Sequence, residues 1–285
     1  MASISALQNV YREEFIKGFD KTESVLRDTV TTEYMSKGGA AIFLVSDTIN
    51  MYAQSRGVNG LIPANPLALT QNTATLVPWH RLETASDFNI FISQGNLPEM
   101  LRVAVMAALN RQVDNDIILG LDTSTTVISA GGPMTIATAT KAQGILGANK
   151  VPDDDQLTFL ITPAARTYLM QTTEFTNSLY VEEKPYADGG LPIFNNKKQV
   201  YRWAGIKVIV DPTLPGAGTS AAHCYMYHKA AIGQAINKQE IEYFTGFNEE
   251  QGYSYAKATM FMGTKVLQTN GIVVITHDDS AIVSG

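Results

Sequence analysis

The residues of this sequence best suited to chemistry are two histidines and a cysteine in the order His223-Cys224-x-x-x-His228. Imidazole and thiolate are common zinc ligands, so the group could hold a metal ion. Five residues apart, however, the histidines point to opposite faces of a strand and lie about 140° apart on a helix. We therefore interpret them as packing and hydrogen-bonding residues. Cys224 is the single cysteine, which excludes an intrachain disulfide and a cysteine-based zinc site and fits synthesis in a reducing cytoplasm.

Three acidic clusters could supply acid–base groups or metal ligands. His277–Asp279 lacks the base-and-orienter geometry of a hydrolytic triad, because adjacent residues cannot provide it by themselves; it predicts a frayed acidic tail. Asp153–Asp155 lacks the ligand spacing, central glycine and closing glutamate of a calcium loop, and predicts a solvated turn. Glu249 and Glu250 predict a turn between two strands, or alternatively a charged contact between subunits.

A glycine-rich segment at Gly216–Ala221, with Glu240 about twenty residues further on, partly matches a dinucleotide-binding fingerprint. That fingerprint must turn directly from a strand into a helix, whose N-terminus then meets the pyrophosphate. Here Pro212–Pro215 intervenes, and Tyr225–His228 predicts a strand instead of a helix. The pattern therefore argues against nucleotide binding.

The composition is that of a globular protein with an acidic charge balance. The 285 residues are 45% hydrophobic, enough for one large domain or two interleaved ones. No apolar run approaches the roughly 18 residues of a membrane span, and the amphipathic N-terminus does not resemble a signal peptide. The net charge is −6 and no lysine lies between Lys37 and Lys141, which argues against tight nucleic-acid binding.

The clearest element is a long helix over residues 96–120. Asn96 can cap it, Pro98 suits its first turn, and Glu99 complements the helix dipole. At about 1.5 Å per residue this helix is a rod of roughly 35 Å. Its apolar residues repeat every four positions: Leu101, Val105, Leu109, Val113 and Ile117.

The sequence before this helix has two parts. Residues 3–20 have the apolar spacing of an amphipathic helix, and the first 37 residues resemble an arm more than a domain. Residues 40–94 contain strand patterns at Ala41–Val45, Thr75–Leu82 and Phe88–Ser93, and the long segment between the first two is too apolar for a disordered tether. We expect either a long surface hairpin or an arm that packs on a neighbouring subunit.

After residue 120 helix and strand patterns alternate. We expect two further helices, a branched apolar strand, an alanine-rich helix and three closing strands: 137–146, 164–171, Ile206–Val210, Lys229–Ile236, 240–247, 253–262 and 272–276.

This order of elements resembles the major capsid proteins of tailed bacteriophages, whose Hong Kong 97-type fold is shared with encapsulins. The most specific local similarities are the strand and proline turn at Ala204–Pro215, the segment Tyr225–Gly233, and the closing strands at Tyr255–Leu267 and Gly271–Ile275. The resemblance implies an α+β fold with an N-terminal arm, an extended β-hairpin loop, a peripheral domain with a long spine helix, and an α/β axial domain. It implies the boundaries 1–37 for the arm, 38–95 for the loop, 96–124 with 237–285 for the peripheral domain, and 125–236 for the axial domain.

The implied function is self-assembly, as hexamers and pentamers, into the icosahedral shell that encloses the double-stranded DNA genome. It implies no catalytic residue, cofactor or metal, and no membrane. Expected partners are a separate scaffolding protein, a portal protein and a decoration protein, with packaged DNA contacted weakly. The expected location is the virion, after assembly in the host bacterial cytoplasm. The candidate inter-subunit contacts are Ile49, Tyr52, Arg56, Leu61, Ile62, Trp79, Arg81, Arg111, Glu249 and Glu250.

Two departures from the family pattern are informative. Some members join their subunits by an isopeptide bond from a loop lysine, but residues 38–95 contain no lysine, so we expect a non-covalent shell. Some begin with a fused scaffolding domain, whereas this chain reaches its loop by residue 40. The alternatives are an encapsulin-type compartment that holds a cargo enzyme, and a soluble α/β enzyme with a pocket near Gly216–Ser220.

Overall fold

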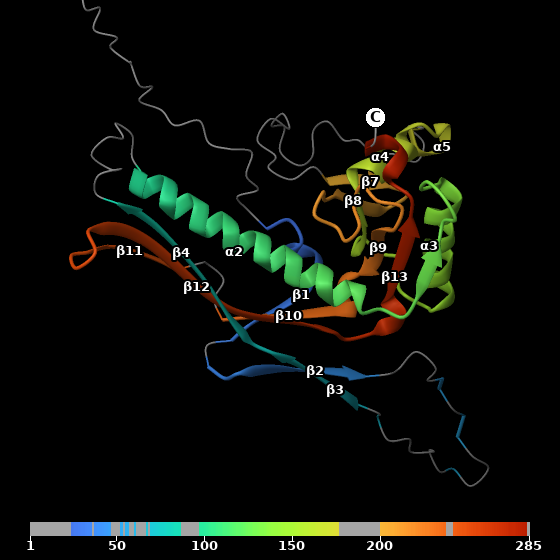
Figure 1. The fold of residues 1–285 in the computed structure, drawn as a ribbon. Helices are drawn as coiled ribbons and strands as arrows, with labels where there is room; N and C mark the ends of the chain where they lie inside the picture. Colours follow the sequence, from blue (N-terminus) through green and yellow to red (C-terminus); the bar gives the residue numbers. More distant parts are fainter. Residues whose placement is uncertain are drawn as a thin grey trace, which may run out of the picture.

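The computed structural model describes most of the chain, and the predicted helix over residues 3–20 lies outside the described part. The described residues are 24–35, 37–46, 52–53, 55–56, 60, 67, 69–86, 97–176, 200–237 and 242–283. Figure 1 shows one long helix that runs along a sheet, a second sheet with helices at one end, and a projecting hairpin.

The described elements mix helices and strands along the whole chain. The helices are α2 (Leu97–Asp122), α3 (Ile136–Ala148), α4 (Pro163–Met170), α5 (Thr173–Thr176) and α6 (Ser280–Val283), with 3₁₀ turns η1 (Arg27–Thr29), η3 (Lys229–Ala231) and η4 (Thr269–Gly271). The strands are β1 (Thr31–Tyr34), β2 (Ala40–Ser46), β3 (Leu69–Thr75), β4 (Val77–Ser86), β5 (Val127–Ser129), β6 (Leu157–Ile161), β7 (Val200–Trp203), β8 (Ile206–Val210), β9 (Ala222–His228), β10 (Ile232–Ile236), β11 (Glu242–Asn248), β12 (Tyr253–Val266) and β13 (Ile272–His277).

The long helix α2 packs on a five-stranded sheet in which β12 is the central strand. β12 pairs with β10 and β11, and also with β4. Alternate residues of β12, such as Ala256 and Ala258, are buried in the core that α2 covers. The row Val105, Val113 and Ile117 of α2 is fully buried in the same core. The predicted helix over 96–120 is confirmed.

The six-stranded sheet has apolar residues buried on both faces. Its order is β5-β13-β9-β6-β8-β7. In β9, Tyr225 and Tyr227 belong to the core beneath α2, whereas Cys224 and Met226 belong to a second core together with residues of α3 and α4. Burial on both faces explains the continuous apolar runs of strands such as Ile206–Val210.

Strands β2 and β3 form a separate antiparallel hairpin that projects from the body (Figure 1). Its base is held by a small core in which Ala41, Phe43 and Ala74 of the hairpin meet Ala235 of β10. A hairpin is therefore present within residues 40–94, but its second strand is β3, most of which was expected in the loop. The strand expected over 75–82 is mainly β4, which pairs with β12. The strand expected over 88–93 lies outside the described residues.

One predicted helix is wrong: Lys229–Ile236 forms the turn η3 followed by strand β10. All five residues of β10 are buried between β1 and β12, and a short buried apolar run does not distinguish a helix from a strand. Gly233 permits close packing in the strand, because an added Cβ would lie 3.0 Å from Phe43.

The closing strand β13 pairs with β9 and β5, so it belongs to the six-stranded sheet. This pairing differs from the expectation that all of residues 237–285 return to the peripheral part.

Within the described residues, none of the helices is long and apolar enough to cross a membrane.

Substitution of Gly263 in β12 tests the close approach between the backbones of β12 and the end of β3. A Cβ at this position would lie 2.0 Å from the backbone oxygen of Thr75. We expect Gly263→Ala to lower the free energy of unfolding by about 1–3 kcal/mol, because backbone must shift. Gly144→Ala is the control, since its Cβ would meet open space in α3 and should stabilise the helix by about 0.5–1 kcal/mol. Denaturant unfolding of the free subunit measures both changes, and an unchanged Gly263→Ala protein would contradict the crossing.

Candidate functional site

The outward face of the β2–β3 hairpin is a row of exposed aliphatic side chains. Ile42, Leu44 and Leu69 are 57%, 61% and 56% exposed. The strand register places them on one face, because Leu69 lies opposite Ser46, two residues beyond Leu44. Neither strand contains a charged residue. An exposed apolar surface without charge is typical of a protein–protein contact.

The loop beyond the hairpin carries five of the predicted contact residues, of which the structure describes two. Tyr52 is 79% exposed, and its ring lies 5.8 Å from Nζ of Lys150. Arg56 is exposed. Ile49, Leu61 and Ile62 lie outside the described residues, so their contacts stay predictions.

Two predicted contact residues on β4 already have partners in their own subunit. Trp79 is partly buried against the core beneath α2. Arg81 donates from Nε to Oε1 of Glu83 over 2.8 Å, within its own strand. Contacts of these side chains with a neighbour stay predictions.

The remaining predicted contacts lie on the surface of the body. Arg111 is an exposed residue of α2. Glu249 and Glu250 occupy the exposed turn between β11 and β12, as the sequence predicts. The side chain of Asn248 holds this turn by accepting the Glu250 N–H at 3.0 Å. The hairpin, α2 and this turn thus present the predicted residues at separate places, not at one cleft.

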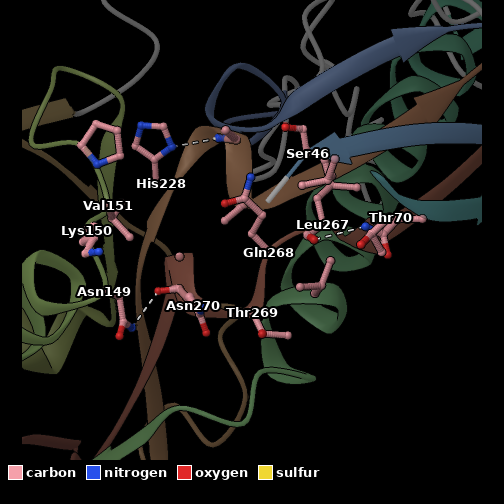
Figure 2. A pocket seen from close by; sticks show the side chains of 17 residues that line it. Ser46, Thr70, Asn149, Lys150, Val151, His228, Leu267, Gln268, Thr269 and Asn270 are labelled. Atoms are coloured by element: carbon pink, nitrogen blue, oxygen red, sulfur yellow. Dashed lines mark hydrogen bonds between the residues drawn. The ribbon is translucent and has the colours of Figure 1, made fainter. Parts of the chain in front are cut away.

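A groove of about 480 Å³ lies where the hairpin meets the body (Figure 2). On one side, Asn72 of β3 donates to the carbonyl oxygen of Leu267 at 3.2 Å. On the other, Asn149 after α3 donates to the carbonyl oxygen of Asn270 at 3.0 Å. These two amides attach the turn between β12 and β13 to both the hairpin and α3. The groove therefore lies where these three segments are held together.

His223 and His228 are structural residues. His223 lies 2.7 Å from Asp122, and His228 lies 3.1 Å from Asp154, at opposite ends of β9. The predicted packing and hydrogen-bonding role is confirmed for both. In the described part of the chain, no group of three or more histidine, cysteine, aspartate or glutamate side chains could hold a metal ion.

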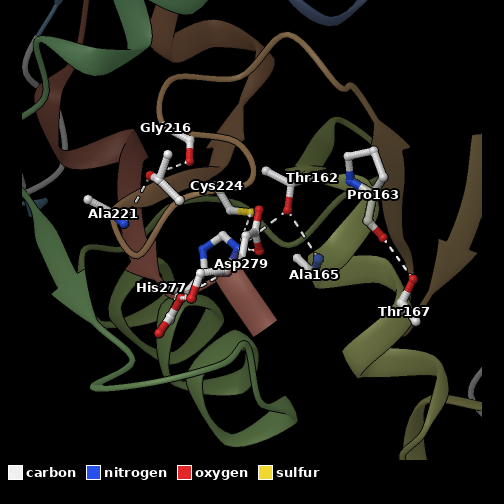
Figure 3. A network of polar contacts seen from close by, with 12 residues as sticks. Thr162, Pro163, Ala165, Thr167, Gly216, Ala221, Cys224, His277 and Asp279 are labelled. Atoms are coloured by element: carbon white, nitrogen blue, oxygen red, sulfur yellow. Dashed lines mark hydrogen bonds and ion pairs between the residues drawn. The ribbon is translucent and has the colours of Figure 1, made fainter. Parts of the chain in front are cut away.

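The predicted frayed tail at His277–Asp279 is wrong, because His277 and Asp279 are buried at 3% and 0% exposure. Figure 3 shows them with Cys224 and Thr162. Nε2 of His277 is the atom nearest all three partners: 2.7 Å from Asp279, 3.4 Å from Thr162 and 3.9 Å from Cys224. A hydrolytic triad instead uses the two ring nitrogens for different partners. Burial also raises the pKa of the Cys224 thiol, so the nucleophilic thiolate is disfavoured.

Three aspartates of α2 that the sequence did not single out connect different parts of the subunit. Asp114 accepts hydrogen bonds from the Ser24 hydroxyl at 2.6 Å and from the Leu26 N–H at 3.1 Å. Asp116 accepts from Thr264 of β12 at 2.6 Å, and burial raises the Asp116 pKa despite that bond. Asp122 contacts β9. The available signal was a group of three carboxylates in the C-terminal third of the helix, but spacing alone does not identify their partners.

Comparison with known proteins decides the family. A family model described as "Phage capsid protein" matches residues 4–279. The chain belongs to the phage capsid protein family. A search of curated proteins found no significant match.

Solved structures agree with this family at the level of the fold. The phage capsid protein aligns with a structure titled "Mycobacterium phage Che8" at TM-score 0.71 and 15% identity, covering 96% of this chain and 98% of that one. The capsid of Ralstonia phage GP4 aligns at TM-score 0.70 and 9% identity, covering 96% of both chains. The capsid structure of cyanophage P-SCSP1u aligns at TM-score 0.68 and 14% identity, covering 95% and 93%. The mixed α+β fold agrees with the expected Hong Kong 97-type fold.

For this capsid protein, the surface is the candidate functional site. Its role is structural: it is a major capsid protein that forms the shell of a phage. The exposed hairpin face is a described surface suited to contact between subunits.

The reactivity of the Cys224 thiol tests whether the side chains around His277 are buried in the folded subunit. In the native subunit we expect it to resist a disulfide-exchange reagent such as DTNB and to react rapidly after unfolding, because the side chain is fully buried. Met170→Cys places a second thiol at a position that is 51% exposed in the wild type and should react at once. Rapid labelling of Cys224 in the folded wild-type protein would contradict this account.

Proposed function

We propose that the capsid protein assembles, as hexamers and pentamers, into a closed icosahedral shell around a double-stranded DNA genome. The observation that carries the proposal is the exposed, uncharged face of the hairpin in a chain of the phage capsid protein family. An acidic subunit suits a container wall, because it confines DNA without binding its phosphates tightly. We also propose that the protein has no catalytic activity.

Membership in the two larger sheets divides the described elements into a proposed peripheral part and a proposed axial part. The peripheral part comprises α2 with β1, β10, β11, β12 and β4, and the axial part comprises the six-stranded sheet with α3 and α4. The hairpin β2–β3 begins the extended loop within residues 38–95. This division moves β13 from the peripheral to the axial part and otherwise follows the expected boundaries.

The proposed contact places the hairpin face of one subunit on the body of the next. Ile42, Leu44 and Leu69 would lie in it, and Ile49, Leu61 and Ile62 would extend it towards the tip of the loop. Repeated heterologous contacts of this kind close into a ring or shell. Each should bury about 1,200–2,000 Å² or more, the range of stable protein interfaces.

The proposed partners follow from assembly. We expect a separate scaffolding protein, a portal protein and a decoration protein as partners of the shell. The completed shell belongs to the virion, and we propose that it assembles in the cytoplasm of the host bacterium.

Electron microscopy of the purified protein, expressed with and without the candidate scaffolding protein, tests this function. We expect closed shells, or hexameric and pentameric rings, because the exposed hairpin face needs a partner surface. A monomer or dimer under both conditions would contradict the proposal.

A charge on the hairpin face tests the proposed contact. We expect Leu44→Lys to leave the melting temperature of the subunit nearly unchanged, because the side chain is 61% exposed. Shell yield should fall at least tenfold, because the contact would bury an unpaired charge. Met170→Lys is the matched control, since this 51% exposed residue ends α4, where a cation is favourable. Normal shells from Leu44→Lys, counted by negative-stain microscopy, would argue against this face.

A further inference from the structure

The peripheral and axial parts of the subunit are connected by three short crossings of the chain. Residues 123–126 join α2 to β5, η3 joins β9 to β10, and residues 267–271 join β12 to β13. The core beneath α2 continues across this junction, since Tyr225 and Val274 of the axial sheet lie in one cluster with Met260 of β12. Apolar packing of this kind is strong but non-directional, so it does not by itself set an angle between the two parts.

Asp122, the last residue of α2, makes directional contacts across the junction. Its Oδ1 accepts from the Tyr225 hydroxyl at 2.9 Å and lies 2.7 Å from Nδ1 of His223. Burial, reinforced by the neighbouring carboxylate, raises the pKa of Tyr225, so the phenol stays protonated as a donor. Hydrogen bonds weaken steeply when they bend, so two bonds that share one oxygen restrict rotation between α2 and β9.

The contacts of Asp122 lie far along β9 from the crossing at Lys229. His223 and Tyr225 precede the crossing at Lys229 by four to six residues, a distance of about 13–20 Å along β9. Asp122 itself lies beside the crossing at residues 123–126, so the contacts are remote only from the crossing at Lys229. At that distance from Lys229 they limit rotation of β9 about its connection to β10 more than a contact beside Lys229 would.

We propose that the Asp122–His223–Tyr225 clasp sets the angle between the spine helix and the axial sheet, and thereby the curvature of the assembled shell. This inference rests on the proposed shell function. Subunits with a loosened angle would still make the hairpin contact, but successive subunits would close on shells of different radii.

Tyrosine substitutions on the same strand provide a matched test. Tyr225→Phe removes one bond of the clasp, and Tyr225→Phe with His223→Ala removes both. Tyr227→Phe is the control, because it removes one hydrogen bond from β9, to Thr29 at 2.6 Å, and leaves both contacts of Asp122 intact. Each single substitution should lower the melting temperature by about 2–4 °C or less.

We expect the double variant to form shells with a diameter distribution at least twice as broad as that of the wild type, together with open sheets. Tyr227→Phe should form shells of normal diameter. Asp122→Asn keeps an acceptor oxygen at the same place and should therefore retain shells of normal diameter. Asp122→Ala removes the acceptor and should broaden the distribution of diameters. Cryo-electron microscopy of shells grown with one scaffolding protein measures all five, and unchanged diameters in the double variant would overturn the proposal.

Amide hydrogen exchange of the free subunit provides a readout that does not depend on assembly. Residues 123–126 should exchange several-fold faster in the double variant than in the wild type, and at the wild-type rate in Tyr227→Phe. An unchanged exchange rate of residues 123–126 in the double variant would also contradict the proposed role of the clasp. Failure of the wild type to form shells would instead contradict the proposed function, and exchange would then decide the clasp alone.

Discussion

The packing of α2 on β12 is the constraint on which the rest of the subunit depends. β12 is the central strand of its sheet, and its small residues Ala256 and Ala258 allow the helix to approach closely. The same helix continues past the sheet, so that Leu121 shares a core with Tyr225 of the axial sheet. One rod of 26 residues therefore positions both sheets, and a shift of that rod would displace both.

Polar groups on α2 complement this apolar core in a distinct way. Asp114 holds the backbone that enters the body from the N-terminal side, Asp116 holds β12, and Asp122 holds β9. Burial of apolar surface supplies most of the stability of such a core but tolerates sliding, whereas each carboxylate contact has a defined direction. The aspartates thus act where three parts of the subunit meet.

The side chains that hold the fold together and the exposed face of the hairpin lie in different parts of the molecule. Groups that could do chemistry are used within the fold: His223 and His228 bind aspartates, and Cys224 lies buried beside His277. The hairpin instead leaves its aliphatic face exposed, although aliphatic side chains would be stabilised by burial. In the proposed shell, this face would lie against a neighbouring copy.

The sequence by itself determined the elements with strong local signals. The capping residue and four-residue apolar repeat predicted α2 to within two residues, and branched residues predicted β8. Only the tertiary structure decided that Ile232–Ile236 is a strand, because its conformation depends on burial between two other strands. It likewise decided the pairing of Asp122 with His223, which are 101 residues apart. Local spacing carries no information about such contacts, which arise when α2 and β9 pack against the same core.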